Sequence, residues 1–230
     1  MQLELNHKKI LDQLPYFVGW GGEETLDLTR EAFESFLGRE LGGKSVLDIG
    51  AGDGRMSCLF ALLGACVSGI DVAADFVQAA TMEAEKWGVQ SQINFHVYSG
   101  LPDALPDSSY DIAFTKSVLL LIPDLEIYLK TLVFKLKPGA KVVFIENAYR
   151  NVFDVFLRRI IHFLRRQYSW KTPKYMDQSR LELIGKHFDI RHIRRLKCSP
   201  LKSRSSGWYL ICAENRHAGD KTGVSGPRSN

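Results

Sequence analysis

The sequence predicts an α/β fold in which a parallel β-sheet is covered by helices on both faces. Short apolar runs alternate with longer amphipathic segments from residue 45 to residue 146, and a glycine-rich turn directly follows the first apolar run. Such alternation is typical of doubly wound sheets, whose ligands bind at the carboxyl ends of the strands. A ligand site is therefore expected where the first strand ends.

The hydrophobic periodicity and the turn signals place the elements along the chain. Strands are expected at 45–49, 66–70, 93–97, 110–115 and 141–146. Helices at 1–13 and 25–37 precede the sheet, helices at 55–63, 75–87 and 123–136 connect its strands, and 137–140 form a turn. The alternation ends after residue 147, where helical patterns cover 151–168 and 178–187 and strands are expected at 190–196 and 208–213.

The turn after the first strand carries the most specific pattern in the chain. Asp48 is followed by Gly50, Gly52 and Gly54, and a second apolar strand ends at Asp71. Glycines let a backbone pass close to a ligand, and an acid after the second strand can accept hydrogen bonds from ribose hydroxyls. A dinucleotide fingerprint would need glycine where Arg55 stands, and no Gly-Lys-Ser/Thr of a P-loop follows. The pattern therefore indicates a nucleoside ligand of another kind.

This D-x-G-x-G-x-G pattern resembles motif I of the class I S-adenosylmethionine-dependent methyltransferases, and the resemblance covers about residues 40–147. It implies a Rossmann-like, seven-stranded sheet, mostly parallel with an antiparallel last strand, and S-adenosylmethionine as cofactor. It further implies that the glycine turn lines the methionine end of the cofactor and that Asp71 holds the ribose. The cofactor-binding residues expected from it are Asp48, Gly50, Ala51, Gly52, Gly54, Asp71, Val72, Ser99, Gly100, Leu101, Lys116 and Trp20.

Two segments depart from the family pattern. Ser99-Gly100-Leu101 stands where relatives often carry Gly-Asp, so backbone or Ser99 contacts are expected to replace the acid beside the adenine. Many small-molecule relatives carry histidines before the Leu/Ile-Pro-Asp that follows strand four, where this chain has Leu120 and Leu121. The obvious general base is therefore missing from this segment.

Candidate catalytic residues follow the fifth strand. Glu146 or Tyr149 could act as a general base and Asn147 could orient the acceptor, because their positions face the expected cleft. The alternative is that these residues only cap the next helix. For Lys116 the alternative to a cofactor contact is a surface or helix-start residue.

An aromatic, glycine-rich segment, residues 16–22, precedes the first core helix. In the family this region often folds over the cofactor; the alternative is that its aromatic side chains cover the sheet edge. It also faintly resembles protein N-terminal methyltransferases, with too thin a match to carry over their substrate.

The charge is divided unevenly along the chain. Residues 1–149 hold 12 Lys and Arg against 20 Asp and Glu, or −8, whereas residues 150–216 hold 16 against 5, or +11. An amphipathic basic helix is expected at 152–166, within an insertion at 149–188 that covers the acceptor pocket. Its basic face could be solvated, could lie on an anionic membrane, or could contact RNA phosphates.

The sequence also predicts the broader setting of the protein. A single methyltransferase domain is expected over 1–215, with cap helices in 1–40 and a disordered tail at 216–230. Four cysteines without a C-x-x-C pair indicate a reducing compartment and no metal site, and no signal peptide or membrane span is recognisable. We expect a cytoplasmic methyltransferase for a small-molecule or lipid-like acceptor, with peripheral membrane contact open. The alternatives are a protein N-terminal or RNA methyltransferase, and a non-catalytic cofactor-binding module.

Overall fold

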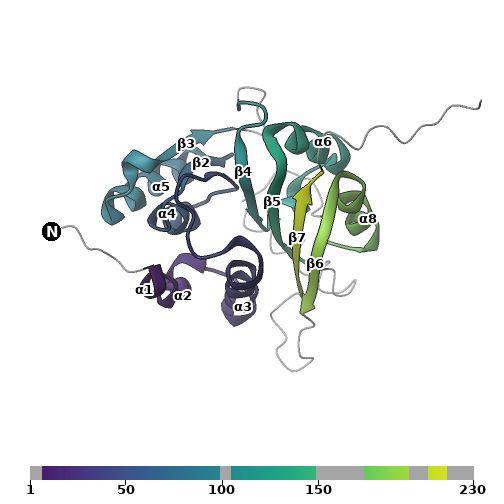
Figure 1. Cartoon of the computed structure of the whole chain (residues 1–230), viewed down its shortest axis with the longest axis horizontal. Coiled ribbons are helices and arrows are strands. Elements are labelled where there is room, and N and C mark those ends of the chain that lie inside the picture. The colour runs from purple at the N-terminus through teal and green to yellow at the C-terminus, as the bar shows by residue number, and fades with distance from the viewer. Residues whose placement is uncertain (1–6, 99–104, 149–173, 197–206, 217–230) are drawn as a thin grey trace, which may run out of the picture.

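The fold is a seven-stranded mixed sheet with helices on both faces (Figure 1). The computed structural model describes residues 7–98, 105–148, 174–196 and 207–216. The strand order is β3-β2-β1-β4-β5-β7-β6. The strands are β1 (Ser45–Ile49), β2 (Cys66–Asp71), β3 (Ile93–Val97), β4 (Tyr110–Lys116), β5 (Leu136–Asn147), β6 (Phe188–Leu196) and β7 (Trp208–Asn215).

Strands β1 to β5 are parallel to one another, and β7 runs antiparallel to both β5 and β6. The predicted fold class is thereby confirmed, including the antiparallel last strand. The predicted limits of β1 and β3 agree with the structure, and those of β2, β4, β6 and β7 differ by one or two residues at an end.

Helices cover the two faces of the sheet unequally. The helices are α1 (His7–Asp12), α2 (Leu14–Val18), α3 (Gly22–Ala32), α4 (Arg55–Leu62), α5 (Ala74–Trp87), α6 (Leu125–Lys135) and α8 (Gln178–His187). Helices α1 to α5 share one apolar core with one face, and α6 and α8 share a second core with the other. Successive residues of β5 alternate between these cores, with Val143 in the first and Phe144 in the second, which explains why this strand is a continuous apolar run.

The N-terminal elements differ from the prediction at their ends. Two short helices, α1 and α2, replace the single helix expected at 1–13. Helix α3 begins three residues earlier than expected, after Gly21 in the left-handed conformation, and a π-helical turn (Phe33–Leu37) extends it. This turn buries both Phe33 and Leu37 in the first core.

The prediction of a turn at 137–140 before the fifth strand is wrong, because β5 already begins at Leu136. Tyr110 of β4 pairs with Leu136, and Ile112 pairs with Lys141, so the residues between them form a bulge within the strand. Gly139 has a φ of +74° in this bulge. Pro and Gly therefore mark an irregular strand here, as they do at many bulges.

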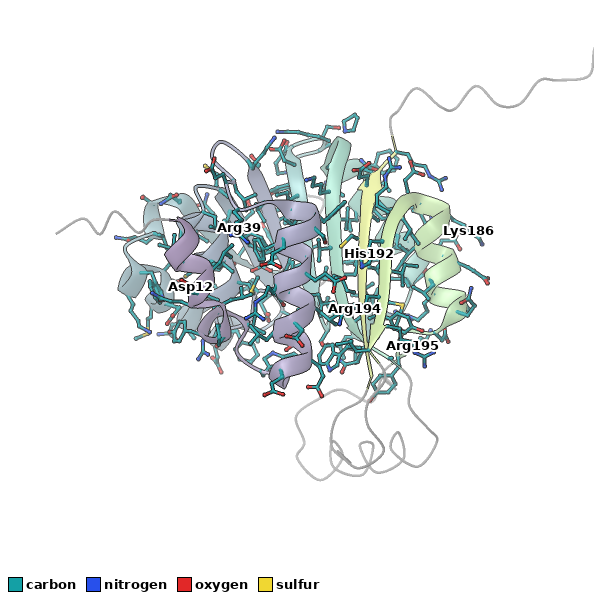
Figure 2. All side chains as sticks on the ribbon, turned by 60° about the horizontal axis from the view of Figure 1, so that its bottom comes forward. Asp12, Arg39, Lys186, His192, Arg194 and Arg195 are labelled. Carbon is teal, nitrogen blue, oxygen red and sulfur yellow. The ribbon has the colours of Figure 1, made fainter. Side chains whose placement is uncertain are left out.

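The outer strand β6 contains Arg191, Arg194 and Arg195, and acidic side chains of the same fold pair with two of these arginines. His192 and Arg194 lie on the side of β6 that faces α3, where both pair with Glu31 (Figure 2). Arg191 pairs with Glu214 at 2.6 Å between Nη2 and Oε2. Because Glu31 lies in α3, outside the C-terminal region, its pairing with Arg194 offsets part of the basic excess of that region. The helix predicted at 151–168 and the tail at 217–230 lie outside the described residues.

Candidate cofactor site

The site lies where β1 and β4 are neighbours in the middle of the sheet. From β1 the chain proceeds to β2 and β3 on one side, whereas β4 leads to β5 on the other. This is the topological switch point at which open α/β sheets bind ligands, at the carboxyl ends of the strands. The glycine turn, Gly50–Gly54, begins at this end of β1 and leads into α4.

The turn is fixed to β2 by its backbone. The N–H groups of Gly50 and Ala51 both donate to the carbonyl of Ile70, at 2.8 and 3.0 Å. Gly54 then donates to the carbonyl of Ala51 at 2.9 Å and serves as the N-cap of α4. The turn is therefore a rigid connection between two strands and a helix.

The three glycines have different neighbours. A Cβ at Gly50 would lie 2.3 Å from Val118 Cγ2, and a Cβ at Gly54 would lie 2.6 Å from Ala80 Cβ. At Gly52 the nearest heavy atom would be the Gly50 carbonyl oxygen at 4.0 Å. Close packing within the protein thus requires Gly50 and Gly54, while Gly52 borders open space. Sequence reasoning assigned all three glycines to the ligand and missed this division.

Asp71 connects the end of β2 to the turn. Its Oδ2 accepts from the Gly52 N–H at 2.9 Å, and its Oδ1 accepts from the Ala73 N–H at 3.0 Å. The residue is partly exposed, and the side chain of Val72 beside it is 68% exposed. Each carboxylate oxygen can accept more than one hydrogen bond. The carboxylate is therefore oriented by backbone donors and still able to receive two hydroxyl donors from solvent or a ligand.

Asp48 lies beneath the turn. It is 2% exposed, and its Oδ2 accepts from Ser57 Oγ of α4 at 2.6 Å. Burial raises the pKa of Asp48 to about 7, against the opposing effect of the Ser57 hydrogen bond. The side chain joins β1 to α4 under the glycines.

Lys116, the last residue of β4, extends toward the N-terminal segment. Its Nζ donates to the carbonyls of Val18 and Trp20, the latter at 2.6 Å, and lies 4.8 Å from the centroid of the Trp20 indole. Burial lowers the pKa of Lys116 to about 8, although Asp53 and Asp48 act in the opposite direction. The Trp20 side chain is 60% exposed and its ring lies 5.8 Å from that of Trp208.

Glu146 is buried behind the loop that follows β4. Its Oε1 accepts from Thr115 Oγ1 and from the N–H groups of Val118 and Leu119, each at 3.1 Å. Arg180 of α8 donates to the carbonyl of Leu119, so both backbone groups of Leu119 are held by buried charged side chains. Burial raises the pKa of Glu146 to about 7, opposed first by the hydrogen bonds from Leu119 and Val118.

Sequence reasoning missed Arg180, because a single arginine in an amphipathic helix gives no signal of burial. Asn147 donates to Ser117 Oγ at 2.6 Å in the same loop. The remaining predicted site residues, Ser99, Gly100, Leu101 and Tyr149, lie outside the described residues.

Comparison with known proteins agrees with this geometry. Residues 47–144 match the family model described as "Methyltransferase domain". A ubiquinone biosynthesis O-methyltransferase of Idiomarina loihiensis is 35% identical over 110 residues, which cover 48% of this chain and 44% of that protein. The chain thus spans less than half the length of the curated relatives it matches. Over residues 47–144 the chain is thus similar to methyltransferase domains.

Solved structures share the fold over a longer stretch. An S-adenosylmethionine-dependent methyltransferase of Methanosarcina mazei has a TM-score of 0.59 at 22% identity, covering 76% of this chain and 93% of that chain. The [4+2]-cyclase SpnF has a TM-score of 0.64 at 16% identity, covering 86% and 84%. Since one of these neighbours is named for another reaction, the likeness defines the fold and leaves the chemistry to the site.

The described residues fit the cofactor of this family. Gly52 leaves open space beside an exposed apolar side chain, Val72, and beside an oriented carboxylate, Asp71. These suit the backbone, adenine and ribose contacts of a nucleoside ligand. Among the described residues no cluster of His, Cys, Asp and Glu could hold a metal ion. Within the same part of the chain, none of the helices has the length and apolar character needed to cross a bilayer.

Proposed function

We propose that the protein transfers a methyl group from S-adenosylmethionine to a small-molecule acceptor. The observation that most supports this proposal is the hydrogen bond from the Gly52 N–H to the Asp71 carboxylate at 2.9 Å. It joins the acid expected to bind a ribose to the glycine turn. The two features are separated by 19 residues in the sequence, and the fold makes them one site.

The roles of the site residues follow from their surroundings. We propose that Gly50, Ala51 and Gly52 present backbone to the methionine end of the cofactor, while Asp71 holds the ribose. Val72 would cover one side of the adenine. Asp48 and Gly54 act through the turn that they support, since Asp48 is buried and Gly54 packs against Ala80.

The reaction places modest demands on the protein. When bound, the cofactor supplies a methyl group already activated on a sulfonium. The chain's residues mainly hold the two reactants in line, and orientation of this kind can lower a barrier by about 7–11 kcal/mol. The loop 117–121 contributes to this orientation of the reactants, because Glu146, Asn147 and Arg180 hold the loop in place.

We propose that Glu146 and Asn147 position this loop and that Tyr149 remains the candidate general base. Glu146 is 1% exposed and already accepts three hydrogen bonds, which favours a supporting role over proton transfer with an acceptor. The relatives named as O-methyltransferases favour a hydroxyl group as the acceptor. The exposed Trp20 beside Trp208 favours an apolar, lipid-like acceptor.

Contact with an anionic membrane is a separate proposal, supported by the +11 charge of residues 150–216. The pairing of Arg194 with Glu31, an acid outside that range, leaves less of this charge for a partner. Sedimentation with vesicles containing about 30% anionic lipid, compared with neutral vesicles at low and high salt, tests it. Equal binding to both vesicle types would contradict the proposal.

Calorimetry with S-adenosylmethionine and with S-adenosylhomocysteine tests the cofactor assignment. Replacing Asp71 by Ala removes two hydrogen bonds to a charged group, each worth about 1.5–3 kcal/mol, and should weaken binding by about a hundredfold or more. Asp75→Ala is the matched control, since Asp75 is an exposed acid in the first turn of α5. Unchanged affinity in the Asp71 variant would contradict its ribose role.

Transfer of a labelled methyl group to metabolite, lipid and peptide fractions separates the remaining alternatives. Label in a small-molecule or lipid fraction supports the proposal. Label only in peptide or RNA would favour a macromolecular acceptor. Cofactor binding with no transfer to any fraction would favour a non-catalytic binding module.

A further inference from the structure

The segment Val18–Gly22 crosses the carboxyl end of the sheet. The residues just before it are firmly packed, whereas the segment itself is rich in glycine. On its N-terminal side Phe17 is 1% exposed, and its ring lies 4.9 Å from that of Trp87 in α5. The Tyr16 carbonyl accepts from Arg55 Nη1 at 3.4 Å. This side of the segment is therefore fixed to α4 and α5.

The glycine-rich side has little conformational preference of its own. Gly19, Gly21 and Gly22 have φ values of +66°, +110° and +73°. Glycines lose more conformational freedom on folding than any other residue, so their order depends on contacts made by the residues between them. Trp20 is that residue, and its side chain is 60% exposed.

Lys116 supplies such contacts from the rigid centre of the sheet. Its backbone pairs with Ile145 of β5, and its Nζ binds the carbonyls on both sides of Gly19 while facing the Trp20 ring at 4.8 Å. The indole in turn lies 5.8 Å from Trp208 of β7. Lys116 at the end of β4 and Trp208 at the start of β7 thus both contact one exposed aromatic ring.

We propose that Lys116 is a positioning residue that holds Trp20 and its flanking glycines in place as one wall of the acceptor pocket. The assignment of this wall to an acceptor pocket rests on the proposed function, whereas the contact of Lys116 with residues 18–20 does not. The desolvated ammonium finds in two carbonyls and an aromatic face the partners that water would otherwise supply. The ring so held is open on its outer side, where a flat apolar group of an acceptor could pack.

Hydrogen–deuterium exchange of residues 18–24 tests the contact without any assay of activity. In Lys116→Met, which keeps most of the length of the side chain and removes its donors, we expect exchange of this segment to accelerate about tenfold or more. Lys116→Arg should restore most of the protection, because a guanidinium can donate to two carbonyls. Lys141→Met is the matched control: Lys141 also donates to a backbone carbonyl, that of Phe36, and lies over its ring.

Calorimetry with S-adenosylhomocysteine on the same four proteins completes the test. We expect weaker binding by about threefold or more in Lys116→Met, with recovery in Lys116→Arg and no change in Lys141→Met. Unchanged exchange in Lys116→Met, or acceleration of residues 18–24 in the Lys141 control, would overturn the proposal. Failure of the wild-type protein to bind S-adenosylhomocysteine would instead refute the proposed function, while the exchange result would still decide the role of Lys116.

Discussion

Replacement of Glu146 separates support of the loop from chemistry. Glu146→Ala leaves the N–H groups of Val118 and Leu119 without their acceptor. It also removes the negative charge that interacts with Arg180. Removing one partner of a buried charged pair typically costs about 3–5 kcal/mol. Glu146→Gln keeps an oxygen acceptor and removes the charge, so it should cost less at neutral pH.

The magnitude for Glu146→Gln depends on pH in a direction that can be worked out. The pKa of Glu146 is raised from 4.5 to about 7 in the folded protein, mainly by burial. Its contribution to stability is therefore fully present below pH 4.5 and is lost as the pH rises through about 7. At about 1.4 kcal/mol for each unit of pKa, the full loss is about 3.5 kcal/mol, and most of it falls between about pH 5 and about pH 8.

The glutamine variant cannot titrate at this position, so its free energy of unfolding should lack this decline. Urea unfolding at about pH 5 and about pH 8 measures the free energy of unfolding of both proteins. The difference between variant and wild type should change by about 2–3 kcal/mol in favour of the variant from the lower to the higher pH. Parallel pH dependences for wild type and Glu146→Gln would refute the reasoning. So would an alanine variant within about 1 kcal/mol of wild type.

Asn215→Ala provides the control for a merely destabilised sheet. The Asn215 amide donates to the carbonyls of Val133, Leu136 and Lys137 at the opposite end of the sheet from the site. Both variants should lose stability. Only Glu146→Ala should also weaken binding of S-adenosylhomocysteine at a temperature where both proteins remain folded.

Two further predictions concern the glycine turn. Gly54→Ala should destabilise the protein by about 2 kcal/mol or more, because a Cβ would meet Ala80 at 2.6 Å and the backbone is left-handed. Gly88→Ala is the control: Gly88 has a φ of +69° and no atom within 4 Å, so the substitution should cost only about 1 kcal/mol in the same thermal unfolding assay. Equal costs for the two substitutions would contradict the packing argument. Ser57→Ala removes the hydrogen bond that favours ionised Asp48, so the pKa of Asp48 in the folded protein should rise from about 7 to a higher value. The free energy of unfolding should fall by about 1–2 kcal/mol at about pH 8 and by less at about pH 5. A larger loss at the lower pH would contradict this assignment.

Periodicity and glycine spacing were sufficient to predict the sheet and its ligand end. The β1 strand is an apolar run that ends in a glycine turn, and both its limits and the position of the turn follow from local sequence. The bulge in β5 could not be recognised in this way, since Pro138 and Gly139 read as a turn until pairing with both Tyr110 and Ile112 is known. Register is a property of two strands, and one strand's sequence does not contain it.

The contacts within the site were less accessible to sequence reasoning. The position of Glu146 at the end of β5 indicated a side chain facing an open cleft, but the groups that donate to it lie in β4 and the loop that follows, 27 to 31 residues away. Arg180 reaches the same loop from α8, and Lys116 reaches the carbonyls of residues 18 and 20. Each of these contacts depends on chain segments that no spacing rule relates.

The two buried acids, Asp48 and Glu146, bear on how any pH profile of this protein is interpreted. Both have a pKa near 7, and both hold backbone or helix in place. Protonation of either weakens a charge-assisted hydrogen bond under the site, so the proposed methyl transfer would decline below pH 7 even with no general base titrating. An acidic limb near pH 7 would therefore identify a catalytic base only if it persisted both in Glu146→Gln and in Asp48→Asn. If the limb disappeared in Glu146→Gln, it would report the loop support.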